Sequence, residues 1–265
     1  MKYLFLSVLI ATVFFACKDE AKNKDITVIE EEIITKTETN PYTHGIEMAH
    51  KKTVFNKNKA VKYDIDLTFG GRQILDATVS VSTDSRHSII EMKNGEKIYI
   101  SDDKVYCSPG LKDDGSVRFA AYTWNYFFLL PYKLNDEGTQ WSDYTPLESE
   151  KDFNASKLSF EANTGDAPDD WYVVYSDKNT NVINHAAYIV TLGKTVGEAE
   201  ADPHAIQYLD YKTVNDVPFA HNWIFWGWRA EEGLTNEIGN ATLSNIKFIG
   251  DLKTDFTIPE AYIER

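Results

Sequence analysis

The segment VKYDIDLTF, residues 61–69, alternates apolar and polar residues without a fault. Its apolar residues are Val61, Tyr63, Ile65, Leu67 and Phe69. Side chains on a β-strand point alternately to opposite faces, so this segment predicts a strand with one buried and one solvated face. A chain built from such strands needs other elements to cover the apolar face of its sheet.

Further strand-like segments follow at short intervals. Asn94-Gly95 lies between two of them and is a strong signal for a hairpin turn. SDKNTN, residues 176–181, predicts a second hairpin connection. The later predicted strands lie within 74–82, 86–92, 96–100, 104–108, 117–122, 157–162, 171–176, 181–192, 205–214, 219–228 and 243–252. They indicate an antiparallel sheet of about ten strands.

Two segments predict helices. Residues 44–54 place Ile46 and Ala49 at helical spacing, and Pro41 lies at the start of this stretch. Residues 122–134 are densely apolar and are stopped by Pro131. Helices packed against one face of an antiparallel sheet give an α+β fold.

Residues 1–16 predict a secretory signal peptide. Lys2 precedes an apolar run that ends at Phe15, which is shorter than the about 20 residues that a membrane-spanning helix needs. Ala16 and Cys17 then resemble the lipobox of bacterial lipoproteins, in which a diacylglycerol is attached to the cysteine, although Phe14 stands where Leu is usual. An ordinary signal peptide, or an apolar helix with a chance cysteine, is the alternative.

Residues 17–40 predict an acylated cysteine followed by a flexible tether, because isolated apolar residues between acids cannot form a core. A short helix or strand over 26–34 is the alternative. Lys18, Asp19 and Glu20 resemble the surface-export signal of Bacteroidota lipoproteins. We therefore expect attachment to the outer membrane on the cell-surface side, with the periplasmic face as the alternative. Residues 41–265 suit a single domain.

The formal net charge of −14 at pH 7 argues against nucleic acid or an anionic membrane surface as a charge-driven partner. The second cysteine, Cys107, has no intramolecular partner once Cys17 is acylated. We expect it to be a buried apolar residue rather than a reactive thiol. A monomer is expected, although the oligomeric state stays open at this point.

The sequence predicts no catalytic residue, no metal and no cofactor, because the recognised catalytic and nucleotide-binding motifs do not occur. Residues 177–181 begin like a calcium loop, but Val182 occupies the glycine position and Tyr188 that of the closing glutamate. His44 and His50 are spaced for different faces of a helix, which argues against a paired metal site. Three later histidines could converge only through the fold: His185, His204 and His221.

The segment WIFWGWR, residues 223–229, is apolar on both faces, which a half-exposed strand does not require. Trp223 and Phe225 share one face, and Trp226 and Trp228 the other. Gly227 allows a bulge or a close backbone approach. Three interpretations are open: core packing on both faces, an apolar ligand cavity, or tryptophans that stack on sugars.

An early helix, an alternating meander, an aromatic helix ending in LLPYKL and late strands around YLDYKTVNDVPFAHNWIFW resemble the outer-membrane lipoprotein-sorting superfamily. This LolA/LolB-like resemblance, which includes Bacteroidota relatives, spans Thr43 to Leu252. It implies a curved antiparallel half-barrel with helices packed on its concave side, and a non-enzymatic carrier of a lipid or other hydrophobic ligand. Covering helices would leave an apolar pocket with these ligand-binding residues: Trp124, Phe128, Trp223 and Phe225. A surface module that binds glycans or proteins, or a hydrolase with an unrecognised site, is the alternative.

Replacing Cys17 with Ala should release the protein from the membrane and abolish palmitate labelling, because the preceding apolar run is too short to anchor the chain. Cell fractionation and metabolic labelling measure both effects. A Cys17→Ala protein that stays in the membrane fraction would contradict the predicted anchor.

Overall fold

The computed structural model describes residues 40–111, 115–252 and 256–265. The predicted signal peptide, Cys17 and almost all of the predicted tether lie outside these residues. Residues 39–265 form one compact unit, to which all of the following description refers.

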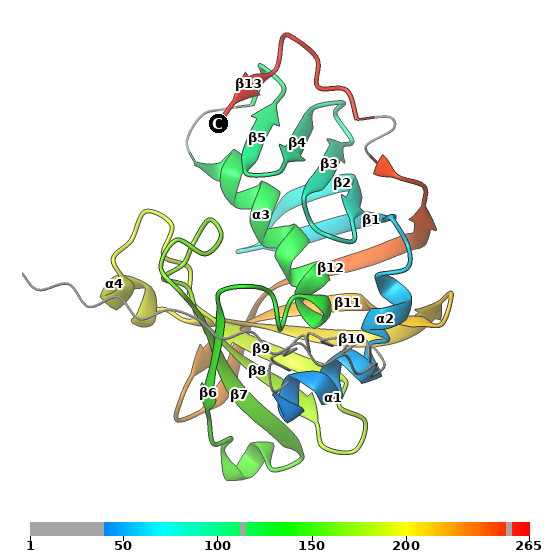
Figure 1. Cartoon of the computed structure of the whole chain (residues 1–265). Coiled ribbons are helices and arrows are strands. Elements are labelled where there is room, and N and C mark those ends of the chain that lie inside the picture. The colour runs from blue at the N-terminus through cyan, green and yellow to red at the C-terminus, as the bar shows by residue number, and fades with distance from the viewer. Residues whose placement is uncertain (1–39, 112–114, 253–255) are drawn as a thin grey trace, which may run out of the picture. The chain divides into compact units, whose positions relative to one another are not determined.

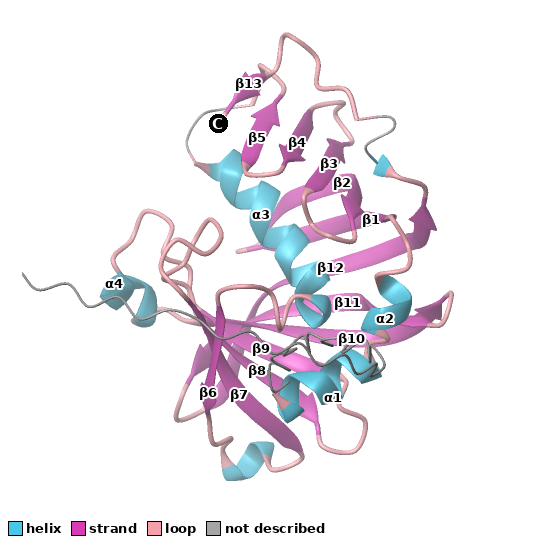
Figure 2. Cartoon of the chain, in the orientation of Figure 1, coloured by secondary structure: helices cyan, strands magenta, loops and turns pink. Residues whose placement is uncertain are grey.

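The described strands form one antiparallel sheet of 13 strands, shown in Figures 1 and 2. They are β1 (Ala60–Phe69), β2 (Arg72–Ser82), β3 (His87–Met92), β4 (Lys97–Ser101), β5 (Lys104–Cys107), β6 (Thr139–Asp143), β7 (Phe153–Phe160), β8 (Tyr172–Asp177), β9 (Ile183–Tyr188), β10 (His204–Val214), β11 (Val217–Arg229), β12 (Gly233–Ile249) and β13 (Ile263–Glu264). Their spatial order is β13-β5-β4-β3-β2-β1-β12-β11-β10-β9-β8-β7-β6, so β13 and β6 are the two edges and the sheet is not closed.

Two meanders make up this sheet, and one strand pair joins them. Consecutive strands pair with each other from β1 through β5, and again from β6 through β12. The antiparallel pairing of β1 with β12 connects the two sets, with Ile65 opposite Leu243 and Leu67 opposite Ala241. Residues far apart in the sequence therefore meet at the middle of the sheet.

The described helices are short, except for one. They are α1 (Pro41–Ala49), α2 (Lys52–Phe55), α3 (Ser116–Leu129), α4 (Val196–Glu200) and the 3-10 turns η1 (Leu130–Tyr132) and η2 (Glu148–Glu150). Helix α1 begins where the Asn40 side chain accepts a hydrogen bond from the amide of Tyr42 at 2.9 Å. Lys51, with φ of 58°, separates α1 from α2. Figure 1 shows the sheet curving around α3, with α1 and α2 on the same side.

The predicted α+β architecture, a curved antiparallel sheet with helices on its concave side, is confirmed. The alternation over 61–69 is also confirmed, because Tyr63, Ile65 and Leu67 are buried while Asp66 is exposed. Both predicted hairpins form, and Gly95 adopts the φ of +90° that its turn requires. Cys107 is a free and buried cysteine in the described structure.

One predicted strand is wrong. Residues 117–122 belong to α3, not to the meander. Val117, Phe119 and Ala121 occupy every second position of this short stretch, which resembles a strand. Over the longer window, Val117, Ala121, Trp124 and Phe128 follow helical spacing and are all buried. The longer pattern decides the structure, because a helix of this length presents that whole face to the core.

The sheet has more strands than the roughly ten that turn spacing predicts. Strand β6, with the sequence TQWSD, is an edge strand with mostly polar and exposed residues, so it lacks a hydrophobic pattern. Strand β13 is two residues long, and Ile263 pairs with Cys107. Strand β12 also begins at Gly233, before the predicted segment 243–252.

The two faces of the sheet carry two separate apolar clusters. The larger one lies under α3 and includes Trp223 and Phe225. The smaller one, which we call the outer-face cluster, consists of Val173, Tyr175, Ala187, Ala205 and Trp228. The two-faced apolar pattern of residues 223–229 is thus explained by packing on both sides. Pairing with β12 shifts register around Trp226, and a Cβ at Gly227 would lie only 2.7 Å from Thr235 Oγ1.

Gly239→Ala should lower the free energy of unfolding by about 1–3 kcal/mol, as overpacking of a tight site does. A Cβ at position 239 would clash with the carbonyl oxygen of Thr68 and lie 2.9 Å from Cα of Phe69, both of which are backbone atoms of β1. Equilibrium urea unfolding measures the change. Gly250→Ala is the matched control, because no atom lies within 4 Å of its Cβ position. An equal effect of the two substitutions would contradict this account of the β1–β12 pair.

Candidate functional site

Aromatic side chains fill the space between α3 and the concave face of the sheet. Positions 124 and 128 share one face of α3, and positions 223 and 225 share one face of β11. All four predicted ligand-binding residues therefore point into this space, and they are buried: Trp124, Phe128, Trp223 and Phe225. We call the rings in this space the concave-face aromatic cluster; it comprises these four and Phe55, Tyr63, Phe127, Tyr132, Tyr208 and Phe219.

The rings of this cluster pack directly on one another. Phe128 stacks between Tyr63, at a centroid distance of 4.2 Å, and Phe219, at 5.4 Å. Trp124 contacts Phe225 edge to face at 6.0 Å. Each such pair contributes about 0.5–1.5 kcal/mol beyond its buried area. The cluster therefore holds α3 on the sheet.

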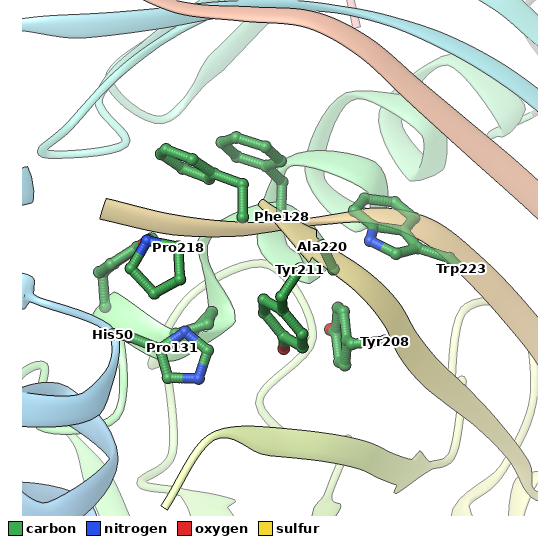
Figure 3. A pocket seen from close by; sticks show the side chains of 10 residues that line it. His50, Phe128, Pro131, Tyr208, Tyr211, Pro218, Ala220 and Trp223 are labelled. Carbon is green, nitrogen blue, oxygen red and sulfur yellow. The ribbon is translucent and has the colours of Figure 1, made fainter. Parts of the chain in front are cut away.

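A small cavity lies at one end of the cluster, between α1, η1 and the β10–β11 hairpin (Figure 3). Its volume is about 20 Å³, which is room for about one water molecule. Six of the residues that line it are His50, Phe128, Tyr132, Tyr208, Tyr211 and Trp223.

The structure brings two of the four predicted residues to the cavity. Phe128 and Trp223 line it, whereas Trp124 and Phe225 do not and contact each other in the cluster. Sequence reasoning did not single out the polar residues of the cavity, His50 and Tyr132. Tyr132 directly follows Pro131 at the end of the aromatic helix, which was a usable signal. No pattern around His50 indicates its partner, which is distant in sequence.

His50, one of the residues that line the cavity, is fully buried and carries one unpaired polar atom. Its Nε2 accepts a hydrogen bond from the amide of Ile183 at 3.0 Å. Burial lowers the pKa of His50 to about 3, so the ring is neutral at pH 7 and carries its proton on Nδ1. Nδ1 has no hydrogen-bond partner among the described residues, and neither has the hydroxyl of Tyr132.

Two of the tyrosines that line the cavity, Tyr208 and Tyr211, donate hydrogen bonds to backbone carbonyls. The hydroxyl of Tyr208 donates to the carbonyl of Phe127 at 2.9 Å, and that of Tyr211 donates to the carbonyl of Ile183 at 2.8 Å. Two of the residues that line the cavity therefore carry a buried polar atom without a partner among the described residues, His50 Nδ1 and Tyr132 Oη.

Two pairs of a histidine and a carboxylate lie in separate places in the described part of the chain. His185 Nε2 lies 3.8 Å from Glu150 Oε1, and His204 Nε2 lies 3.8 Å from Asp202 Oδ1, in separate places. Among the residues described, no three His, Cys, Asp or Glu side chains are grouped to hold a metal ion. The lining of the cavity contains no carboxylate, serine or cysteine. Within the same described residues, the helices are too short or too polar to cross a membrane.

No protein-family model and no curated protein matches the sequence. In structure, the chain is similar to a LolA superfamily protein from Nitrosomonas europaea, with a TM-score of 0.51 and 11% identity over 82% of this chain and 97% of that chain. It is also similar to a DUF1329 family protein from Desulfovibrio piger, with a TM-score of 0.49 and 13% identity over 79% and 94% of the two chains. The chain therefore has the fold of the LolA superfamily protein, and the resemblance expected from the sequence is confirmed at the level of the fold.

His50 should make folding less stable as the pH falls from 7 to 5. The unfolded chain takes up a proton on this ring below its ordinary pKa of 6.5, whereas the folded chain does not until about pH 3. The contribution amounts to roughly 2 kcal/mol over this range. Urea unfolding of wild type and His50→Gln at both pH values measures it: the variant should lose less stability by that amount, since carboxylate contributions are common to both proteins.

His44→Gln, on the same helix but exposed to water, is the matched control and should keep the wild-type pH dependence. Parallel pH profiles for wild type and His50→Gln would show that His50 is not a buried neutral ring.

Proposed function

We propose that this chain is a non-enzymatic lipoprotein of the cell envelope that binds or carries a lipid or another hydrophobic ligand on the concave face of its sheet. The observation that carries the proposal is the concave-face aromatic cluster, with a cavity lined by aromatic rings and by two residues, His50 and Tyr132, that carry unpaired buried polar atoms. Binding sites for hydrophobic molecules have this composition, mostly apolar with a few polar groups that set orientation.

A ligand has to displace aromatic rings in order to bind. The cavity of about 20 Å³ is far smaller than an acyl chain, so the space must open. On one side the cavity is lined by His50, at the C-terminal end of α1, a helix of nine residues, and by η1, of three. Helices this short have little stability of their own and depend on packing. Their movement away from the β10–β11 hairpin is the opening that costs the fewest regular hydrogen bonds.

The polar groups of the cavity favour a neutral acceptor on the ligand. His50 is uncharged and donates through Nδ1, and Tyr132 supplies a hydroxyl. An ester carbonyl would satisfy both, whereas a carboxylate would bring an uncompensated charge into an apolar site. The proposed ligands are therefore molecules that carry an acyl ester, rather than free ionised fatty acids.

The proposed location is the outer membrane, with the chain anchored through acylated Cys17 and facing the cell surface rather than the periplasm. The support is the sequence alone: a short apolar run, the Ala16-Cys17 junction and the charged residues 18–20. Residues 17–40 then act as a tether between the anchor and the folded unit. The folded unit is proposed to be a monomer that does not bind nucleic acid.

A fluorescent acyl ester should bind saturably to residues 39–265 and be displaced by envelope lipid extract. Trp223→Phe should weaken this binding about three- to tenfold, since Trp223 forms a wall of the cavity and an aromatic contact contributes about 0.5–1.5 kcal/mol. Fluorescence titration gives the dissociation constants.

Trp226→Phe is the matched control, because Trp226 is on the same strand and packs against the outer-face cluster. It should leave the affinity unchanged. Absence of saturable binding to a folded sample free of co-purified lipid would make the concave-face aromatic cluster a structural core only, and the carrier function would be rejected.

A further inference from the structure

A second and larger pocket opens on the other side of the sheet, with a volume of about 330 Å³. We call it the outer pocket; the lining side chains used here are Tyr144, Lys157, Trp171, Glu200, Trp228 and Arg229, with Glu231 at its rim. Trp228 and Val173 at its base belong to the outer-face cluster, so the outer pocket lies on the face opposite α3. It is separate from the cavity described above.

Two tryptophans form the walls of the outer pocket. The rings of Trp171 and Trp228 pack edge to face, with their centroids 6.1 Å apart and an interplanar angle of 70°. Trp228 is only 5% exposed, so it supports the ring of Trp171, which is partly exposed.

Trp171 is held in place by charged neighbours, although it is partly exposed. Its Nε1 donates to Glu200 Oε1 at 3.2 Å, and the ammonium of Lys157 lies 4.5 Å from the ring centroid. Tyr144, near the other wall, contacts Tyr175 edge to face at 6.0 Å. The aromatic walls are therefore positioned before any ligand arrives, which reduces the entropy cost of binding.

The charges around the outer pocket balance. Two cationic side chains, Lys157 and Arg229, face two acidic ones, Glu200 and Glu231. In a chain with a net charge of −14, this local neutrality is a departure from the rest of the molecule. A ligand with many neutral hydroxyl groups uses both signs, because each hydroxyl donates to a carboxylate and accepts from a cation.

We propose that the outer pocket binds a neutral saccharide. The C–H face of a sugar ring matches the exposed part of the Trp171 indole, and its hydroxyls match the mixed charges of the lining. The volume lies at the lower end of the range for ligand pockets, about 300–1,000 Å³, which suits a mono- or disaccharide unit.

Other ligand classes fit this pocket less well. An anion gains no net attraction, because Glu200 and Glu231 offset Lys157 and Arg229. An organic ammonium ion would compete with Lys157, which already occupies a face of Trp171. An acyl chain would remove four charged groups from water without giving them partners, which is strongly unfavourable. The proposal does not depend on the proposed lipid-binding function, because the two sites share no lining residue.

Isothermal titration of the full chain with neutral trisaccharides of glucose, mannose, xylose and N-acetylglucosamine tests the proposal. At least one trisaccharide should bind saturably, and Trp171→Ala should weaken it roughly tenfold or more through loss of a stacking surface. Glu231→Gln should stay within about threefold of wild type, because an amide still bonds to hydroxyls. Trp226→Phe, which alters a tryptophan of the same strand as Trp228 outside the pocket lining, should have no effect.

Choline chloride and inorganic phosphate serve as counter-probes and should not bind saturably. Trp171→Phe keeps a ring at this position and is the variant to use if Trp171→Ala does not fold. It should weaken saccharide binding by a smaller factor than Trp171→Ala. The proposal is overturned if no neutral trisaccharide binds, if affinity is unchanged in a folded Trp171 variant, or if choline binds and Glu231→Gln abolishes that binding. None of these results bears on the acyl-ester titration.

Discussion

The pairing of β1 with β12 is the contact on which the rest of the structure depends. It joins residues 60–69 to residues 239–249 and merges two meanders into one sheet. Without it, each meander would expose a long strand edge, which favours aggregation. The pair needs a close backbone approach, which Gly239 allows beside Thr68 and Phe69. Because this contact joins residues that are far apart in the sequence, its formation has to offset the entropy cost of closing a long loop.

One continuous sheet gives the molecule two chemically different faces, and β11 contributes to both. Trp223 and Phe225 pack under α3, in mostly aromatic and aliphatic surroundings. Trp226 and Trp228 pack on the other side, next to a rim of charged residues. The irregular register around Gly227 lets the strand end with Trp228 buried at the base of the outer pocket. A single strand therefore connects a dry aromatic core to a mixed aromatic and charged surface.

Local patterns predicted those parts of the structure that depend on local physics. The alternation of apolar and polar residues predicted β1, and turn residues predicted the hairpins. Segment 223–229, which is apolar on both faces, indicated a strand covered on both sides. Residues 117–122 were misread because a short window cannot distinguish alternation from part of a helix. Of the predicted ligand-binding residues, Phe128 and Trp223 line the cavity. His50 could not be found in this way, because its environment is set by Ile183, which is 133 positions away in sequence.

A filled concave face has a direct consequence for a protein that is proposed to carry a ligand. In the closed state, ring–ring contacts already bury the apolar surface that a ligand would cover. The net affinity is then the gain from ligand contacts minus the free energy of opening, and it falls in proportion to the fraction of open molecules. A permanently open apolar pocket would bind more tightly but would also be a sticky surface and would release its ligand slowly. Closure by the protein's own rings competes with the ligand and so favours release, while the unpaired His50 Nδ1 and Tyr132 hydroxyl lower the advantage of the closed state. The balance between these two terms is what sets a reversible carrier apart from a storage protein.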